Sequence, residues 1–392
     1  MIGRNELVWG LLQVDESQHD LSFDFCSGIY GFQAKSMAVF SDEMRRQFAR
    51  RGIGFNEISV RIPEKIQHGW IGFFAGVMCR YFYYPCKVRL RRRSRVVFIA
   101  DSANAGIYNF LPAQTRVAVF LHGLAYQQDF KVSGIKADLK DRIIQLASRV
   151  FKKPGLINAD LIFTNSERGK KDFLAFAESR AGQEIIVAPL GVARQFRRVK
   201  EAGLRAKLGI PTRAKIILSV AAPDLRKNID VVVDALGRLG DAVGDWVWVH
   251  IGGLHPSVSA RMPRQIAEKG IFLRQVENAD MPAFYSMADV FVLPTQYDTF
   301  GWPPLEAAAC GCPVITSNIE PLNENLRDIA LFVEPSDAQK LAELMIRVLN
   351  DGQLARELSA KGGVVCERFS WERTAEIVVD ALHHLLARVD RP

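Results

Sequence analysis

Short apolar runs rich in β-branched residues alternate along the chain with longer stretches whose apolar positions recur every three or four residues. The first pattern is typical of buried parallel strands, and the second of amphipathic helices. The runs lie at Val96–Ala100, Val117–Leu121, Leu161–Thr164, Ile185–Ala188, Lys215–Val220, Trp246–Ile251, Val290–Leu293 and Pro313–Thr316. The helical stretches lie at Gln33–Arg51, Ser166–Ala177, Ile229–Leu239, Met281–Ala288, Pro304–Ala309 and Ala338–Leu349. This alternation predicts a doubly wound α/β fold rather than a bundle or a sandwich.

The length of 392 residues fits two domains, since one domain usually takes about 100–200 residues. The predicted boundary follows Pro189–Val192, where a polar and basic stretch, Ala193–Arg205, precedes a new strand at Lys215. We therefore predict one Rossmann-like domain over residues 1–192 and another over residues 193–369. Ligands of open α/β sheets bind beyond the carboxyl ends of the strands, so the residues that follow each strand are the candidates for chemistry.

The net charge of +8 is uneven along the chain. Residues 1–190 carry 27 Lys and Arg against 18 Asp and Glu, whereas the remainder carries 24 against 25. A basic excess favours anionic partners such as phosphates, nucleic acid or an acidic membrane, although many of these charges only solvate the surface.

The six cysteines form neither a Cys-x-x-Cys pair nor a zinc-type spacing with histidine, so we expect free thiols in a reducing cytosol. The first 20 residues lack the pattern of a signal peptide, and no apolar run reaches the roughly 18–20 residues of a membrane span. These features predict a cytoplasmic protein. No Asp-x-Asp pair occurs, which argues against a metal-bridged diphosphate, and we expect neither a metal nor a cofactor.

The sharpest local signal is the segment Asp298–Asn318, which follows the run Val290–Leu293. It predicts a loop containing Gly301, then a helix that starts at two prolines, then another strand. This order places Glu306 in the first turn of the helix, beside N–H groups that bind anions and where a carboxylate could hold ribose hydroxyls. By spacing alone, a favourable first-turn charge explains Glu306 equally well.

This segment resembles the carboxylate motif of retaining glycosyltransferases of family 4, which have the GT-B fold. In that family two glutamates separated by seven residues enclose Phe-Gly and Pro-x-Leu-Glu-Ala, and here Glu306 matches the second glutamate. Asp298 takes the first position, with a carboxylate one methylene shorter. The resemblance implies that Glu306 holds the donor ribose, that Asp298 faces the sugar, and that Phe300 and Gly301 belong to the donor site.

A second stretch, Ile217–Asp230, is similar to the strand and loop that hold the donor diphosphate in this family. The resemblance implies that Arg226 and Lys227 contact the pyrophosphate, where fixed cations stabilise the charge that develops on the leaving group. Many relatives carry an arginine at the strand end where this chain has Ala221-Ala222. The alternative reading of the two cations is a solvated surface pair.

Other segments match the family at single positions. A strand ends in His122, for which the resemblance implies a place near the reacting sugar, although a lone histidine after a strand is more often structural. Arg274 and Val276 lie where relatives present the backbone to the nucleobase. Gly28 and Gly31 stand at a candidate acceptor or phosphate loop before the first helix.

The resemblance covers most of the chain and implies two Rossmann-like domains facing across a cleft, with a last helix over residues 370–392 that crosses back to the first. It implies a retaining, metal-independent hexosyltransferase with His122, Asp298 and Lys227 as catalytic residues. The expected partners are a UDP- or GDP-sugar and a glycan or lipid-linked acceptor, in bacterial polysaccharide assembly. Mannose from GDP-mannose is our expectation for the donor.

Three other functions stay open. A nucleotide-sugar epimerase or hydrolase on the same fold would turn over the donor without a second substrate. A non-catalytic nucleotide-sugar-binding protein is suggested by the departures at Asp298 and Ala221-Ala222. Nucleic-acid binding is permitted by the charge, but no nucleic-acid motif surrounds the basic cluster, and we expect none.

An aromatic and apolar segment, residues 70–85, precedes a basic cluster at Lys87–Arg95. This combination fits interfacial binding to anionic lipid, and it predicts peripheral docking of residues 70–95 on the inner face of the cytoplasmic membrane. A core helix with a solvated basic end explains the pattern equally well.

Overall fold

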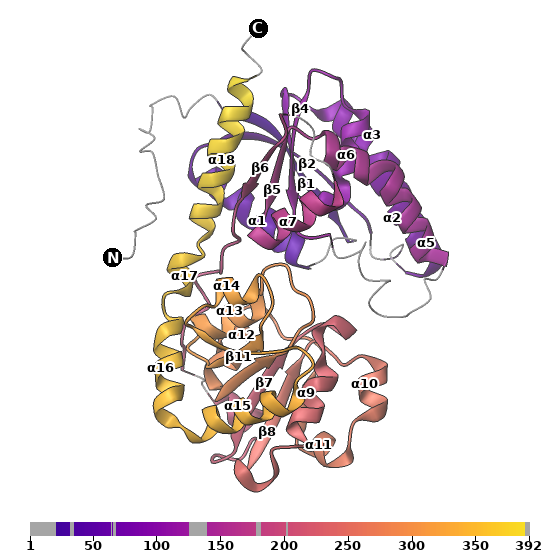
Figure 1. Ribbon diagram of the computed structural model, residues 1–392. Coiled ribbons are helices and arrows are strands. Elements are labelled where there is room, and N and C mark those ends of the chain that lie inside the picture. The colour runs from indigo at the N-terminus through magenta and orange to yellow at the C-terminus, as the bar shows by residue number, and fades with distance from the viewer. Residues whose placement is uncertain are drawn as a thin grey trace. The chain divides into compact units, whose positions relative to one another are not determined.

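The strands of the protein form two separate parallel sheets, each accompanied by helices (Figure 1). The computed structural model describes residues 21–31, 35–63, 65, 68–124, 139–177, 182–200 and 203–388. By its internal contacts the chain separates into two compact units: one holds the residues up to Val119, Arg142–Asp160 and those from Val379, and the other holds Phe120–Asp141 and Leu161–Val378.

The first sheet has the strand order β2-β1-β3-β4-β5-β6. Its strands are β1 (Ser22–Tyr30), β2 (Gly54–Arg61), β3 (Val96–Ile99), β4 (Arg116–Leu121), β5 (Leu161–Thr164) and β6 (Glu184–Val187). The pairs β2–β1, β1–β3, β3–β4 and β5–β6 are parallel. The helical segments in this part of the chain are α1 (Lys35–Arg50), α2 (Gly69–Met78), η3 (Cys79–Tyr83), α3 (Tyr84–Arg91), η4 (Ser102–Phe110), α5 (Leu139–Ala147), η5 (Ser148–Lys152), α6 (Lys153–Asn158) and α7 (Glu167–Phe176).

The second sheet has the order β12-β11-β10-β7-β8-β9, and all its neighbouring strands are parallel. Its strands are β7 (Lys215–Val220), β8 (Trp246–Ile251), β9 (Gly270–Leu273), β10 (Val290–Leu293), β11 (Val314–Ser317) and β12 (Ala330–Val333). The helical segments are α8 (Leu204–Lys207), η6 (Leu225–Lys227), α9 (Ile229–Leu236), η7 (Gly240–Ala242), α10 (Pro256–Arg261), α11 (Arg264–Glu268), α12 (Met281–Met287), α13 (Trp302–Ala309), α14 (Leu322–Asn325), α15 (Ala338–Asn350), α16 (Gly352–Gly362), α17 (Val365–Arg368) and α18 (Trp371–Ala387).

The predicted doubly wound α/β fold is confirmed, and each predicted strand and helix has a counterpart whose ends differ by at most a few residues. The strands that the apolar pattern does not predict are β1, β2, β9 and β12. The predicted division after residue 192 falls between the end of β6 and the start of β7, and as a domain boundary it stays a prediction.

The candidate glycine loop near the start is in part a strand. Gly28 lies inside β1, where the register against β2 shifts between Cys26 and Gly28, and its φ of 127° suits a bulge that favours glycine. The Gly28 N–H donates to the Tyr84 hydroxyl at 3.2 Å, so this donor is already engaged. Gly31 follows the strand, and the next three residues, 32–34, lie outside the described residues.

Close packing of two helices helps to hold α13 in place beside the second sheet. A Cβ atom built on Gly362, near the end of α16, would lie 2.0 Å from the carbonyl oxygen of Ala308 in α13. Only a glycine therefore allows the two backbones to approach this closely. The next residue, Gly363, has ordinary room, since its nearest neighbour would lie at 3.5 Å.

We predict that Gly362→Ala lowers the free energy of unfolding by about 2 kcal/mol or more, because α16 must move away from α13. Gly363→Ala is the matched control and should change stability by less than about 1 kcal/mol. Thermal and chemical unfolding of both variants measure the difference. Equal stability of the two variants would contradict the close contact.

Candidate functional site

The strand order of the second sheet defines where a ligand is expected. The chain runs outward from β7 to β8 and β9 on one side, and from β10 to β11 and β12 on the other. The neighbours β7 and β10 therefore form a topological switch point, beyond which open α/β sheets bind their ligands. The loops that follow these two strands carry Lys227 and Asp298.

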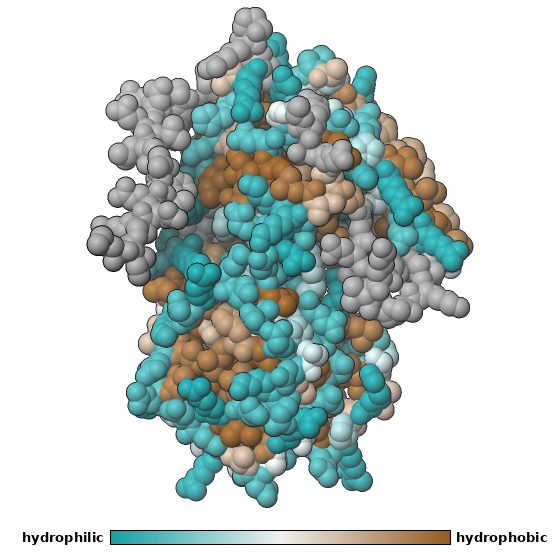
Figure 2. All heavy atoms as spheres, in the orientation of Figure 1, coloured by the Kyte–Doolittle hydropathy of each residue, from teal (hydrophilic) through white to brown (hydrophobic). Residues whose placement is uncertain are grey.

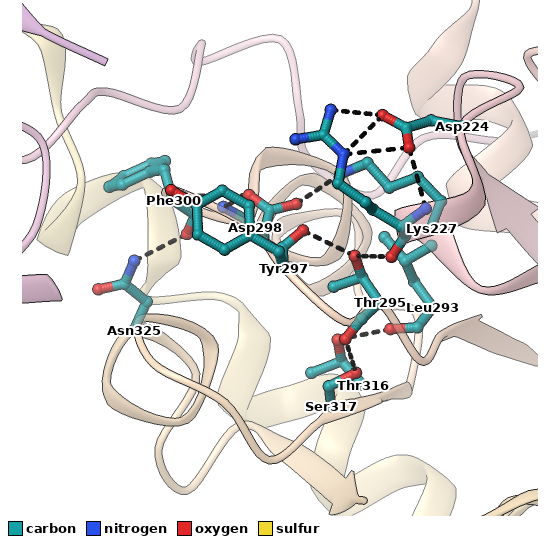
Figure 3. A network of polar contacts seen from close by, with 12 residues as sticks. Asp224, Lys227, Leu293, Thr295, Tyr297, Asp298, Phe300, Thr316, Ser317 and Asn325 are labelled. Atoms are coloured by element: carbon teal, nitrogen blue, oxygen red, sulfur yellow. Dashed lines mark hydrogen bonds and ion pairs between the residues drawn. The ribbon is translucent and has the colours of Figure 1, made fainter. Parts of the chain in front are cut away.

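An ion pair joins these two loops (Figure 3). The Lys227 Nζ lies 2.7 Å from Oδ2 of Asp298, and the side chains are 23% and 11% exposed. Oδ1 of Asp298 accepts hydrogen bonds from the backbone N–H groups of Phe300 at 3.1 Å and Gly301 at 2.8 Å. Burial raises the pKa of Asp298, but the Lys227 ammonium and the two N–H donors outweigh it and hold the pKa below its usual value. The carboxylate is therefore ionised and fixed.

Backbone contacts hold the two loops together around the ion pair. Asn228 is buried in the left-handed region with a φ of 59°, and its Nδ2 donates to the Pro294 carbonyl at 2.8 Å. The Thr295 hydroxyl and the Gln296 N–H both lie within hydrogen-bond distance of the Arg226 carbonyl, at 2.9 and 2.8 Å. Lys227 is therefore presented from a rigid turn.

Arg226 is paired with a carboxylate that the sequence did not single out. Its Nη2 lies 2.5 Å from Oδ2 of Asp224, and its Nε contacts both oxygens of the same carboxylate. Burial raises the pKa of Asp224, but the Arg226 hydrogen bonds lower it by more than burial raises it. The net pKa is below its usual value, so the pair is ionised. The cations of this loop thus both face carboxylates, which balances the positive charge expected here.

The expected placement of Glu306 in the first helical turn is wrong. Helix α13 begins at Trp302, so Glu306 lies in its second turn. The expected anion site at the helix start is also weakened, because Pro303 and Pro304 have no N–H and the N–H of Gly301 already binds Asp298. Any anion at this place must therefore be held chiefly by side chains.

Glu306 instead has a buried partner on the preceding helix. The Tyr285 hydroxyl in α12 donates to Oε2 of Glu306 at 2.9 Å. Burial raises the pKa of Glu306 to about 7, although the Tyr285 hydrogen bond lowers it in part. Burial and the neighbouring Glu306 raise the pKa of Tyr285 well above its usual value, so the tyrosine stays a donor. Glu306 therefore changes protonation near neutral pH.

A pocket of about 410 Å³ opens beyond the carboxyl ends of β7, β8 and β9. This volume suits a planar base or a similar group. Half-exposed Phe272 is one of the residues in its wall, and Arg274 lies two residues beyond. The lining residues are Pro223, Gly252, Gly253, Leu254, Ser259, Phe272, Leu273 and Arg274.

Four other predicted site residues are Phe300, Val276, His122 and Gly28. Phe300 is buried with its ring 5.6 Å from that of Phe369, its N–H donates to Asp298, and its carbonyl accepts from Asn325 at 2.8 Å. Val276 does not line the pocket. His122 follows β4 in the first sheet, where it is buried with its ring 4.7 Å from Phe120, and Gly28 belongs to β1 of that sheet.

The sequence reasoning missed the partners rather than the main residues of the site. Asp224, Asn228 and Thr295 position the two cations, and Tyr285 positions Glu306. An Asp two residues before an Arg, and an Asn directly before a helix, are the signals that could have found two of them. Within the described part of the chain, no three His, Cys, Asp or Glu side chains are grouped to hold a metal ion.

Comparisons with known proteins show which family and which structures the chain resembles. Residues 201–364, less than half of the chain, match the family of glycosyl transferases group 1. The structure resembles sucrose-phosphate synthase from Thermosynechococcus elongatus with a TM-score of 0.71 and 21% identity, over 94% of this chain and 99% of that one. The protein therefore has the GT-B type of fold.

Two curated relatives match part of the chain. The serotype-specific mannosyltransferase WbdA of Escherichia coli is 27% identical over 240 residues, which is 58% of this chain and 29% of that protein. A D-inositol 3-phosphate glycosyltransferase of Geodermatophilus obscurus is 27% identical over 265 residues, or 64% and 58% of the two chains. The chain thus spans less than a third of the first relative and less than two thirds of the second.

The buried ion pair leads to a prediction about stability. Lys227→Met should lower the free energy of unfolding by about 3 kcal/mol at neutral pH, because Asp298 then keeps a buried charge without its partner. The lowered pKa of Asp298 means that the pair stabilises the fold above the unfolded pKa of about 3.9 and loses this effect as the pH falls through the folded pKa. The deficit should therefore shrink in acid.

Chemical unfolding at neutral pH and at a series of pH values from about 4 down to about 2 measures this dependence. Lys227→Met/Asp298→Asn should recover most of the loss, since no unpaired charge stays buried. Lys340→Met, which breaks an exposed pair with Glu343, is the control and should cost less than about 1 kcal/mol. A deficit that is independent of pH would show that packing, not charge, explains the loss.

Proposed function

We propose that the protein is a retaining, metal-independent glycosyltransferase that moves a sugar from a nucleoside-diphosphate sugar to a glycan or lipid-linked acceptor. The observation that carries the proposal is the Lys227–Asp298 pair at the switch point between β7 and β10. The match of residues 201–364 to glycosyl transferases group 1 covers both residues and supports the same reading. The partial likeness to WbdA favours polysaccharide assembly and a mannosyl donor, with GDP-mannose as the first compound to test.

The donor diphosphate takes the place between the loops that follow β7 and β10. In the free protein the Lys227 ammonium faces Asp298, and the Arg226 guanidinium faces Asp224. The anionic diphosphate competes for both cations, so that Lys227 turns to the phosphate that becomes the leaving group. The freed Asp298 carboxylate then accepts hydrogen bonds from sugar hydroxyls. The four charges sum to zero before binding, which keeps the empty site stable.

The remaining parts of the donor are held by Glu306 and the pocket. Ionised Glu306 accepts hydrogen bonds from the two ribose hydroxyls, as acidic residues do in dinucleotide sites. The base enters the 410 Å³ pocket, stacks on Phe272 and meets the backbone at Leu273 and Arg274.

The reaction that this arrangement supports is a substitution at the anomeric carbon. The acceptor hydroxyl oxygen forms a bond to that carbon while the bond to the phosphate oxygen breaks. Attack takes place on the face from which the diphosphate leaves, so the configuration is retained, and the leaving phosphate oxygen takes the acceptor proton. Lys227 and Arg226 stabilise the charge that develops on the diphosphate. His122, at the end of β4, is proposed to contact the sugar.

Nucleotide binding tests the donor site directly. Calorimetric titration with UDP and with GDP, in the presence of a chelator, should show binding of one of the two. Glu306→Gln should weaken that binding at least about tenfold at slightly alkaline pH, where the wild-type carboxylate is ionised. The proposal fails if neither nucleotide binds, or if binding requires a divalent cation.

The raised pKa of Glu306 predicts a pH dependence of the same binding. Because only the ionised carboxylate accepts both ribose hydroxyls, affinity for a sugar nucleotide should fall about tenfold per pH unit below about pH 7. Tyr285→Phe should move the midpoint to higher pH, since its hydroxyl lowers the Glu306 pKa. Glu306→Gln should remove the dependence. An intact sugar nucleotide is the ligand of choice, because its diester phosphates do not titrate in this range.

Lys227 carries the prediction about the chemical step. Lys227→Ala should lower kcat/KM for sugar transfer by about 10²–10³-fold, because it removes a fixed charge beside the leaving group. The matched control is Lys215→Ala. Lys215 lies at the start of β7, where it is paired with Asp289, and its removal should leave the rate near wild type. Turnover of the donor without an acceptor would point to an epimerase or hydrolase, and a near-wild-type rate would remove Lys227 from the mechanism.

A further inference from the structure

One helical run in the first part of the chain presents its apolar side to solvent. Segments α2, η3 and α3 follow one another without a break in helical backbone from Gly69 to Arg91. Along this run, large exposed apolar side chains stand at intervals of four residues, and two more stand directly next to one of these positions. They are Trp70, Ile71, Phe74, Met78, Phe82, Tyr83 and Leu90, with exposed fractions that range from 43% for Phe82 to 82% for Leu90.

The side of the run that faces the protein is no more apolar than the exposed side. Tyr81, Tyr84 and Val88 are buried there, and the Tyr84 hydroxyl donates to the Ile58 carbonyl at 2.7 Å. A spacing of four residues would drift around an α-helix with 3.6 residues per turn. The wider π turn at Cys79–Tyr83 inserts one extra residue and reduces that drift, so the exposed apolar side chains form one stripe.

A second helical run, formed by α5, η5 and α6 (Leu139–Asn158), extends this surface. The ring of Phe151, in η5, lies 5.2 Å from the ring of Tyr81 and 5.5 Å from that of Phe82. On its exposed side, Leu146 and Val150 alternate with basic side chains at Arg142 and Arg149. Figure 1 draws α2 and α5 at the right, and apolar surface reaches solvent along the same edge of Figure 2.

The charge of the two runs is almost entirely positive. Residues 69–95 contain seven Lys and Arg and no Asp or Glu, and residues 139–158 contain five Lys and Arg and one acid, Asp141. We name the exposed side chains of these two stretches the basic apolar face. A large exposed apolar patch in a folded protein marks a contact surface, and the charged residues of these two stretches are cations with the single exception of Asp141.

We propose that the basic apolar face docks on the surface of a bilayer that contains anionic lipids. The rings of Trp70, Phe74 and Tyr83 would lie at the level of the headgroups and upper acyl chains, where aromatic side chains prefer to lie. Arg142 and Arg149 would contact lipid phosphates. None of the helices in the described residues is long and apolar enough to cross a bilayer, so the contact would be interfacial.

Charge decides between a bilayer and a second copy of the chain. A symmetric dimer through this face would bring the arginines of both copies together, with Asp141 as the one acid of the two stretches against twelve Lys and Arg. An anionic bilayer supplies both the apolar layer and the negative charge. The biological purpose of docking rests on the proposed function, since docking would bring a transferase to a lipid-linked acceptor. The docking itself does not require catalysis.

Vesicle flotation of the full chain tests the proposal. The protein should float with vesicles of phosphatidylcholine that contain about 30% phosphatidylglycerol, and less with phosphatidylcholine alone or at raised salt. Trp70→Ser/Phe74→Ser should weaken binding to the anionic vesicles at least about tenfold, because it removes apolar area that would be buried. Arg142→Glu/Arg149→Glu should weaken it by at least about tenfold through charge.

Matched variants elsewhere separate this surface from general effects. Leu174→Ser/Val364→Ser removes two exposed apolar side chains, and Arg261→Glu/Arg264→Glu reverses two exposed charges, and none of these four residues belongs to the basic apolar face. These variants should float like the wild type. Thermal unfolding identifies any variant that fails to fold, and Ile71→Ser/Leu90→Ser then replaces the aromatic pair.

Three results would overturn the proposal: no flotation with anionic vesicles, equal loss in the control variants, or full binding by Trp70→Ser/Phe74→Ser. A wild-type dimer that this variant abolishes, without vesicle binding, would assign the face to contacts between copies. Calorimetric nucleotide binding by the same variants should match the wild type. If the wild type floats with anionic vesicles but binds no nucleotide, the proposed transferase function fails and the docking proposal stands.

Discussion

The ion pair between Lys227 and Asp298 is the interaction on which the candidate site depends. It joins the loops after the two strands at the switch point of the second sheet, and the Asp298 carboxylate also fixes the start of the next segment through two N–H groups. A single buried carboxylate thereby sets the positions of a cation and of the turn that leads into α13. Because the pair is nearly buried, its energy depends on both members, and the loss of one leaves the other as a buried charge without its partner.

The two carboxylates of this site, Asp298 and Glu306, are held in different environments. Asp298 has a cation and two N–H donors, which keep it ionised despite burial, whereas Glu306 has one hydroxyl donor and a pKa raised to about 7. One acid is therefore a permanent charge, and the other is ionised only in part at neutral pH. A ligand whose hydroxyls donate hydrogen bonds to Glu306 would give this carboxylate a set of donors comparable to the one that Asp298 already has.

The sequence predicts the continuous apolar strands but not those that carry polar or half-exposed side chains. Three of the missed strands, β2, β9 and β12, lie at sheet edges, where one side faces solvent and no apolar run is needed. The fourth, β1, lies inside its sheet but holds Asp24, whose carboxylate accepts N–H bonds from Arg93 and Ser94. In the site, the motif residues were predictable, but their partners depend on contacts between loops about 70 positions apart in sequence.

The segment that follows β2 shows why an apolar pattern alone does not separate core from surface. It has aromatic residues both on the exposed stripe and on the buried side, so composition fits a core helix and an interfacial helix equally well. What distinguishes them is the direction of each side chain, and the π turn at Cys79–Tyr83 alters that direction midway along the run. Burial of Tyr84 and exposure of Trp70 follow from this geometry, and with them the basis for assigning the segment to a surface rather than to the core.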